Sequence, residues 1–218
     1  MHHWPVHTLE LAAIGLGANV GPARQILVHA VTALRAMPGV SLVGVSRLYR
    51  TRPVGPVAQA DFWNAVATLL VPAGRSPEEG AMALLIALKG LERALGRQQR
   101  ERWGPRELDL DLLLFGSHRL RVERDPRARS DDPARGGVQW LVVPHPLAAE
   151  RAFVLAPLAD LLPDQEPPGW GLSVTDAWAR ARALEGEESV RAVADWDAVS
   201  GSWRDLDADL SGGSGDAP

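Results

Sequence analysis

Two acidic residues, Asp109 and Asp111, alternate with leucines in a short apolar stretch. Successive side chains of a β-strand point to opposite faces, so the two carboxylates would share one face with Leu113. The opposite face would carry four leucines, Leu108, Leu110, Leu112 and Leu114. Given a rise of about 3.3 Å per residue, the carboxylates would stand about 6–7 Å apart. At an effective dielectric constant of about 20, two such charges repel by about 2–3 kcal/mol, so we expect a proton or cations between them.

The residues that precede this strand are rich in arginine. Arg97, Arg100, Arg102 and Arg106 oppose one acid, Glu101, which gives a local charge of +3 (four minus one) in a chain of net charge −4. Guanidinium groups bind phosphate oxygens through paired hydrogen bonds, and Mg²⁺ shares its coordination sites between carboxylates, water and phosphates. The pattern therefore predicts a site for a metal-bound polyphosphate. The alternative is a solvated surface loop followed by an edge strand with one polar face.

The segment Arg102–Leu113 also carries a long motif. It reads Arg-Trp-Gly-Pro-Arg-Glu-Leu-Asp-Leu-Asp-Leu-Leu and resembles the signature of the 6-hydroxymethyl-7,8-dihydropterin pyrophosphokinase family of the folate pathway. The resemblance covers about residues 9–165. It implies transfer of the β,γ-diphosphate of ATP to the hydroxymethyl group of the pterin, with release of AMP.

The same resemblance implies roles for the residues of the motif. Asp109 and Asp111 would hold two Mg²⁺ ions that clamp the attacking and leaving oxygens. The catalytic cations that neutralise the triphosphate would be Arg97, Arg102 and Arg106. No dedicated nucleophile is expected, because in-line transfer to a positioned alcohol does not require one.

An aromatic residue and an amide, Phe62 and Asn64, share one face of a second predicted strand. Such a pair suits a flat heterocycle, since the ring can stack and the amide can form paired hydrogen bonds. By the resemblance, the pterin-binding residues are Thr51, Val54, Phe62, Asn64 and Phe153. In many relatives the first aromatic is a tyrosine, so Phe62 lacks a hydroxyl that they carry.

The nucleotide site is also implied by the resemblance. Its residues would be Glu92, Arg97, Trp103, Arg106, Leu112, His145 and Arg151. From the sequence alone, Glu92 can equally be an exposed acid in the last turn of a helix, where a carboxylate opposes the helix dipole. Some relatives have an arginine and a threonine before Val-Pro-His, where this chain has Trp140 and Val142. Either an arginine of the segment 116–140 replaces that contact, or this segment is a solvated loop.

Strands predicted over 9–16, 40–50, 62–71 and 108–115 are separated by helices over about 22–34 and 76–95. This order favours a ferredoxin-like, split βαβ α/β sandwich with a mainly antiparallel central sheet and helices on its faces. A further helix is predicted over 172–184 and a last strand over 189–194. The glycine-rich turn 15–22 lacks a Gly-Lys-Ser/Thr motif, so we interpret it as a tight crossover in which Asn19 has no catalytic role.

We expect one catalytic domain over 1–199. Within it, the stretch 116–140 is crowded with Arg, Asp, Pro and Gly and predicts a mobile loop insertion. The residues 200–218 end in Ser-Gly-Gly-Ser-Gly-Asp-Ala-Pro and predict a disordered tail.

Composition limits the class of protein. The 46% hydrophobic content suffices for a core, and no apolar run approaches a membrane span. The net charge of −4 argues against a nucleic-acid-binding surface, and the absence of cysteine excludes thiolate chemistry. We expect a cytoplasmic monomer whose partners are small molecules, ATP and the pterin, with no membrane or nucleic acid. Two alternatives are another two-metal Asp-x-Asp nucleotidyl- or phosphotransferase and a non-enzymatic ferredoxin-like RNA binder.

Overall fold

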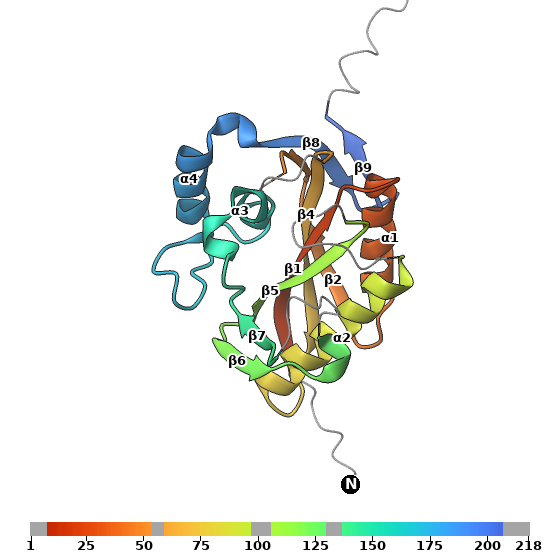
Figure 1. The fold of residues 1–218 in the computed structure, drawn as a ribbon, viewed down its shortest axis with the longest axis vertical. Coiled ribbons are helices and arrows are strands. Elements are labelled where there is room, and N and C mark those ends of the chain that lie inside the picture. Colours follow the sequence, from red (N-terminus) through yellow and green to blue (C-terminus); the bar gives the residue numbers. More distant parts are fainter. Residues whose placement is uncertain (1–7, 54–58, 97–105, 130–136, 207–218) are drawn as a thin grey trace, which may run out of the picture.

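The computed structural model describes residues 8–53, 59–96, 106–129 and 137–206 (Figure 1). Its central sheet consists of β1 (Leu9–Ala18), β2 (Ser41–Val45), β3 (Leu48–Thr51), β4 (Phe62–Pro72), β5 (Asp109–Phe115), β8 (Val190–Asp197) and β9 (Ser202–Asp205). Six of these seven strands lie in the order β5-β1-β4-β3-β8-β9, and the seventh, β2, pairs with β4. All the paired strands are antiparallel. Two further strands, β6 (Leu120–Glu123) and β7 (Trp140–Val143), form a separate small sheet.

The helices cover both faces of the central sheet. They are α1 (Ala23–Arg35), α2 (Pro77–Ala94), α3 (Ala152–Ala159) and α4 (Val174–Glu185), with short 3₁₀ helices η1 (Pro126–Ala128), η3 (Ala148–Glu150) and η4 (Glu187–Ser189). In Figure 1, α3 and α4 lie to the left of the sheet and α1 to its right. Because α1 joins β1 to β2 and α2 joins β4 to β5, the order β5-β1-β4-β3 confirms the predicted ferredoxin-like fold.

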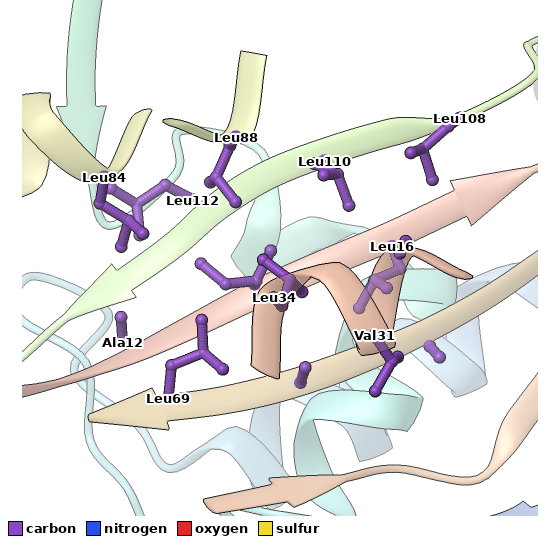
Figure 2. Close-up of a cluster of buried hydrophobic side chains, with 14 of the residues drawn as sticks. Ala12, Leu16, Val31, Leu34, Leu69, Leu84, Leu88, Leu108, Leu110 and Leu112 are labelled. Carbon is purple, nitrogen blue, oxygen red and sulfur yellow. The ribbon is translucent and has the colours of Figure 1, made fainter. Parts of the chain in front are cut away.

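Two hydrophobic clusters fill the space between these layers. One lies between the sheet and the pair α1 and α2, and Figure 2 shows leucines of β1, β4 and β5 directed toward Val31 and Leu34 of α1 and Leu84 and Leu88 of α2. The other lies between the opposite face of the sheet and the pair α3 and α4. The sheet is thus buried on both faces over most of its area, and its polar side chains concentrate near the ends of β4 and β5.

Helix α2 begins and ends where its sequence predicts. Ser76 precedes the helix and its Oγ accepts a hydrogen bond from the backbone N–H of Glu79 at 3.3 Å, while Pro77 takes the first helical position. The chain leaves the helix through Gly96, whose φ of 91° is readily adopted only by glycine.

The predicted strand 40–50 is interrupted, and the reason lies in a distant segment. Ser46 separates β2 from β3, and its hydroxyl accepts a hydrogen bond from the backbone N–H of Val66 at 2.9 Å. The carbonyl of Ser46 in turn accepts a hydrogen bond from the indole of Trp203 at 2.9 Å. Trp203 is buried in β9, so the predicted end of the domain at residue 199 and the predicted disorder from residue 200 are wrong as far as residue 206.

The stretch 116–140, predicted to be a mobile loop, also needs correction. Its described part contains β6, which pairs with β7 from Leu120 opposite Val143 to Glu123 opposite Trp140. Helix η1 follows, and its Ala128 is fully buried. The segment therefore contributes a wall beside β5. Within the described residues, no helix has the length and apolar character needed to cross a membrane.

Candidate active site

The two aspartates of β5 lie on the sheet face that carries α3. Asp109 pairs across the ladder with Gly17 and Asp111 with Gly15, and both acids are half-buried. Leu113 lies in the α3-side cluster, so the predicted alternation is confirmed up to this residue. Beyond it the prediction for Leu114 is wrong, because a register shift opposite Ala13 and Ile14 turns Leu114 to the α3 side as well.

Strand β1 has no side chain at Gly17, beside the first aspartate. Gly17 lies between Asp109 on one neighbouring strand and Asn64 on the other. A Cβ atom at Gly17 would lie 3.1 Å from Oδ1 of Asn64, whereas the space over Gly15 is covered by the side chain of Leu113, 3.4 Å from the position of a Cβ. Only the backbone of Gly17 therefore separates Asp109 from the amide, and a ligand can approach β1 closely there.

The predicted pterin residues lie on this same face. The Nδ2 of Asn64 donates a hydrogen bond to Oγ1 of Thr51 at 2.7 Å, and both side chains are buried. Phe62 shares their face of the sheet by strand alternation, and Phe153 belongs to α3, which covers that face. The structure thus brings four of the five predicted residues to one side of the sheet, and Val54 lies outside the described residues.

Basic side chains accompany the carboxylates. Arg106 forms an ion pair with Asp109. Arg151 is half-buried, with its guanidinium carbon 5.5 Å from the ring centre of Phe153. Burial lowers the pKa of Arg151, the nearby charge of Asp111 opposes that shift, and the charge of Arg106 adds to it. The three predicted residues Arg97, Arg102 and Trp103 lie outside the described part of the chain.

His145 joins the same electrostatic environment. Its backbone N–H donates a hydrogen bond to the carbonyl of Leu113 at 2.9 Å, which holds the Val-Pro-His segment against β5. Burial lowers the pKa of His145 below its ordinary value, and the negative charge of Asp111 opposes this more strongly than the positive charge of Arg151 assists it. Burial therefore favours the neutral imidazole of His145.

Glu92 is not the exposed acid that local sequence reasoning allowed. Its side chain is buried at 2% exposure, and its Oε1 accepts hydrogen bonds from the backbone N–H of Leu110 and from Nζ of Lys89, each at 2.7 Å. Lys89 also donates to the carbonyl of Leu110 at 3.0 Å. The two side chains thereby hold the outer edge of β5 at the residue between the aspartates. Sequence reasoning missed Lys89, although it is the only lysine of the chain and lies three residues before Glu92.

Asn19 has a structural role that the sequence interpretation understated. Its backbone N–H donates to the carbonyl of Arg106 at 2.9 Å, and its Oδ1 accepts from the N–H of Arg106 at 2.7 Å. Its Nδ2 donates to Oε1 of Gln59 at 3.0 Å and to the carbonyl of Ala60 at 3.1 Å. One buried amide therefore joins the end of β1 to the segments that enter β4 and β5. An asparagine directly after the end of a glycine-containing strand was the available signal.

A small cavity of about 120 Å³ opens beside Asp111. It is lined by Leu85, Asp111, Leu112, Arg124, Trp140, Leu141, Val142, His145 and Pro146. Predicted nucleotide residues Leu112 and His145 thus meet a wall formed by β7 and Arg124. A larger cavity, about 590 Å³, lies between the start of α1 and Trp203 and contains none of the predicted site residues.

The residues present fit a hard divalent cation. Within the described part of the chain, no cluster of three or more His, Asp or Glu side chains is arranged to hold a metal ion. Asp109 and Asp111 supply carboxylate oxygens as ligands and leave the other coordination positions of the ion to water and to phosphate oxygens, the pattern that Mg²⁺ favours. Paired carboxylates and cations on one face of a ferredoxin-like sheet are typical of an enzyme that transfers phosphate-containing groups.

Comparison with known proteins gives the family. Residues 13–163 match the family described as 7,8-dihydro-6-hydroxymethylpterin-pyrophosphokinase (HPPK), and the chain belongs to this family. The 2-amino-4-hydroxy-6-hydroxymethyldihydropteridine pyrophosphokinase of Synechocystis sp. is 36% identical over 183 residues, which cover 80% of this chain and 82% of that protein. The protein of the same name from Pseudomonas aeruginosa is 39% identical over 160 residues, 73% of this chain and 85% of its own length.

Solved structures support the fold. The wild-type HPPK-DHPS of Plasmodium falciparum superposes with a TM-score of 0.67 over 94% of this chain, at 13% sequence identity. The matched region is 51% of that protein, so this chain spans about half of it. At this level of identity the likeness establishes the shared fold alone.

Proposed function

We propose that this chain transfers the β,γ-diphosphate of ATP to the hydroxymethyl group of 6-hydroxymethyl-7,8-dihydropterin and releases AMP, a step of folate biosynthesis. The observation that carries this proposal is that Asp109 and Asp111 on β5 and Asn64 on β4 flank β1 on one face of the sheet, where Gly17 has no side chain between Asp109 and Asn64. It offers a phosphate-side half and a heterocycle-side half on one face of the sheet. Family membership and the names of the relatives support the same reaction.

In this reaction the hydroxyl oxygen of the pterin forms a bond to the β-phosphorus. The bond between the β-phosphorus and the oxygen that bridges it to the α-phosphorus breaks, and AMP leaves with the electron pair. The hydroxyl proton passes to solvent. Since the protein supplies no covalent intermediate, its contribution is to align the two substrates and to stabilise charge.

The phosphate half of the site consists of acids and cations on one face of the sheet, with Arg106 paired to Asp109. Asp109 and Asp111 would hold Mg²⁺, two ions on this proposal, which when bound neutralises and aligns the polyphosphate. Arg106 and Arg151 would stabilise the charge that remains, together with Arg97 and Arg102. The neutral imidazole of His145 would donate one hydrogen bond to a phosphate oxygen without adding charge. Glu92, Leu112 and Trp103 would complete the nucleotide side.

The heterocycle half is arranged by a buried hydrogen bond. Because Nδ2 of Asn64 donates to Thr51, the amide is held with Oδ1 toward the open space over Gly17. This oxygen would accept hydrogen bonds from the N–H groups of a pterin, and Phe62 and Phe153 would pack against the ring faces. Val54 is part of the same proposal.

The decisive experiment identifies which bond breaks. Purified protein with ATP, Mg²⁺ and the dihydropterin should yield AMP and a pterin diphosphate in equal amounts by chromatography. ADP with a pterin monophosphate would replace the proposal by an ordinary kinase, and free pyrophosphate with an adenylated acceptor would replace it by a nucleotidyltransferase. We propose in addition that the enzyme works as a cytoplasmic monomer, which light scattering and cell fractionation test.

A further inference from the structure

The cavity beside Asp111 has an uneven charge distribution. Among its lining residues in the described part of the chain, Asp111 is the acid and Arg124 is the guanidinium. The strand that forms the facing wall, β7, contributes apolar side chains there, those of Trp140, Leu141 and Val142. An anionic ligand that enters this cavity therefore meets the guanidinium of Arg124, which comes from the segment between β6 and η1.

Arg124 is held in place by the start of β7. Its backbone N–H donates a hydrogen bond to the carbonyl of Gln139 at 2.7 Å, and its Nε donates to the carbonyl of Trp140 at 3.0 Å. Trp140 itself is covered by the guanidinium of Arg121, 4.1 Å from a ring centre. Because backbone and side chain are both tied to β7, less conformational entropy is lost when Arg124 binds a ligand.

Arg124 lies beside the active-site residues. It lines the same cavity as Asp111 and His145. The guanidinium of Arg151, from the segment before α3, lies over Phe153 on the face of the sheet that carries the two aspartates. Two guanidinium groups from different segments suit a polyphosphate chain, whose oxygens guanidinium groups bind through charge-assisted hydrogen bonds.

We infer that Arg124 is a further nucleotide-binding residue of this chain and contacts the phosphate groups of ATP from the β7 side of the cavity. The inference rests on the proposed function, since it assigns a residue to that nucleotide site. It also gives the segment 116–140 a role, because this segment delivers the cation that β7 lacks at the cavity.

Calorimetry with three ligands separates a phosphate contact from simple packing. The Mg²⁺ complex of a non-hydrolysable ATP analogue should bind Arg124→Ala about 10- to 100-fold more weakly than the wild type, the usual range for losing a hydrogen bond to a charged group. Adenosine, which has no phosphate, should bind within about 2-fold of wild type, and AMP shows whether the α-phosphate takes part. Arg124→Lys should keep part of the affinity, because the charge remains without the planar fork.

Arg127→Ala is the matched control. Arg127 lies three residues away, and its guanidinium is largely exposed and bound to Asp125. This variant should bind the analogue like the wild type, and its KM for ATP should be unchanged. In Arg124→Ala the KM for ATP should rise in proportion to the lost affinity, with the KM for the pterin changing by less than about 3-fold.

Equal affinity of the analogue for Arg124→Ala and Arg127→Ala, in an enzyme that still produces AMP, would overturn this inference and leave the proposed function standing. An equal loss of affinity for adenosine and for the analogue would also overturn it, because the residue would then act through packing. A wild-type protein that binds no nucleotide would overturn both the inference and the proposed function.

Discussion

Replacing Gly17 by alanine should damage pterin binding while leaving the fold intact. The new Cβ would lie 3.1 Å from Oδ1 of Asn64, closer than ordinary contacts of about 3.4–4 Å, so the amide has to move by a few tenths of an ångström. Asn64 is held by its 2.7 Å hydrogen bond to Thr51, which such a shift would lengthen or misalign. The loss of one well-placed hydrogen bond to the pterin corresponds to about 1–2 kcal/mol, or about 5- to 30-fold in affinity.

The assay compares Gly17→Ala with Gly15→Ala. The Cβ at Gly15 would meet the side chain of Leu113 at 3.4 Å, an ordinary contact with a flexible residue, so this variant should keep wild-type pterin affinity. Both alanines reduce the entropy of the unfolded chain, worth about 0.4–1 kcal/mol, so neither should lower the melting temperature much. Pterin affinity is measured by calorimetry with the ATP analogue and Mg²⁺ present. If Gly17→Ala binds the pterin as tightly as Gly15→Ala does, the assignment of Gly17 and Asn64 to the pterin site is refuted.

Three further predictions follow from the same structure. Asp109→Asn or Asp111→Asn should reduce turnover by several orders of magnitude, while circular dichroism shows that the variant is folded. A variant that keeps more than about a tenth of wild-type turnover would remove that residue from the mechanism. The ATP analogue should raise the affinity for the pterin, because Asn19 joins the segments that enter β4 and β5. Equal pterin affinities by calorimetry with and without the analogue would contradict this. An increase in pterin affinity that is as large in Asn19→Ala as in the wild type would contradict it too. Burial and the charge of Asp160 raise the pKa of Tyr49, the only tyrosine, so the folded state keeps a proton that the unfolded state loses above about pH 10. Stability should therefore fall as pH rises beyond that value, more in the wild type than in Tyr49→Phe, while ultraviolet absorbance shows ionisation only on unfolding.

The alternation of β5 was predictable because it depends on local strand geometry. A period of two places Asp109 and Asp111 on one face whatever their neighbours are, and the structure confirms it. Leu114 was not predictable, since the bulge that turns it lies in the pairing with β1 and involves Ala13 and Ile14. A register shift is a property of two strands, and one strand's sequence does not contain it.

The missed elements share a dependence on distant partners. Strand β9 is four residues long and is held by β8 and by the hydrogen bond from Trp203 to Ser46, which is 157 residues away in the sequence. Glu92 opposes the dipole of its own helix, so local reasoning disfavoured its position, yet its hydrogen bonds to Leu110 and Lys89 satisfy it when buried. In both cases tertiary contacts outweigh a weak local preference.

The ion pair between Arg106 and Asp109 explains how the site tolerates its acids before substrate binds. Two bare carboxylates on one strand face would repel by about 2–3 kcal/mol, and a guanidinium at one of them removes most of that cost. On the proposed mechanism Asp109 would hold Mg²⁺ and this guanidinium would turn to the polyphosphate. The backbone of Arg106 stays fixed meanwhile, because Asn19 bonds both its N–H and its carbonyl. Only the side chain of Arg106 would then need to rotate, from an oxygen of Asp109 to an oxygen of the polyphosphate, and Asp109 would become available as a ligand for Mg²⁺.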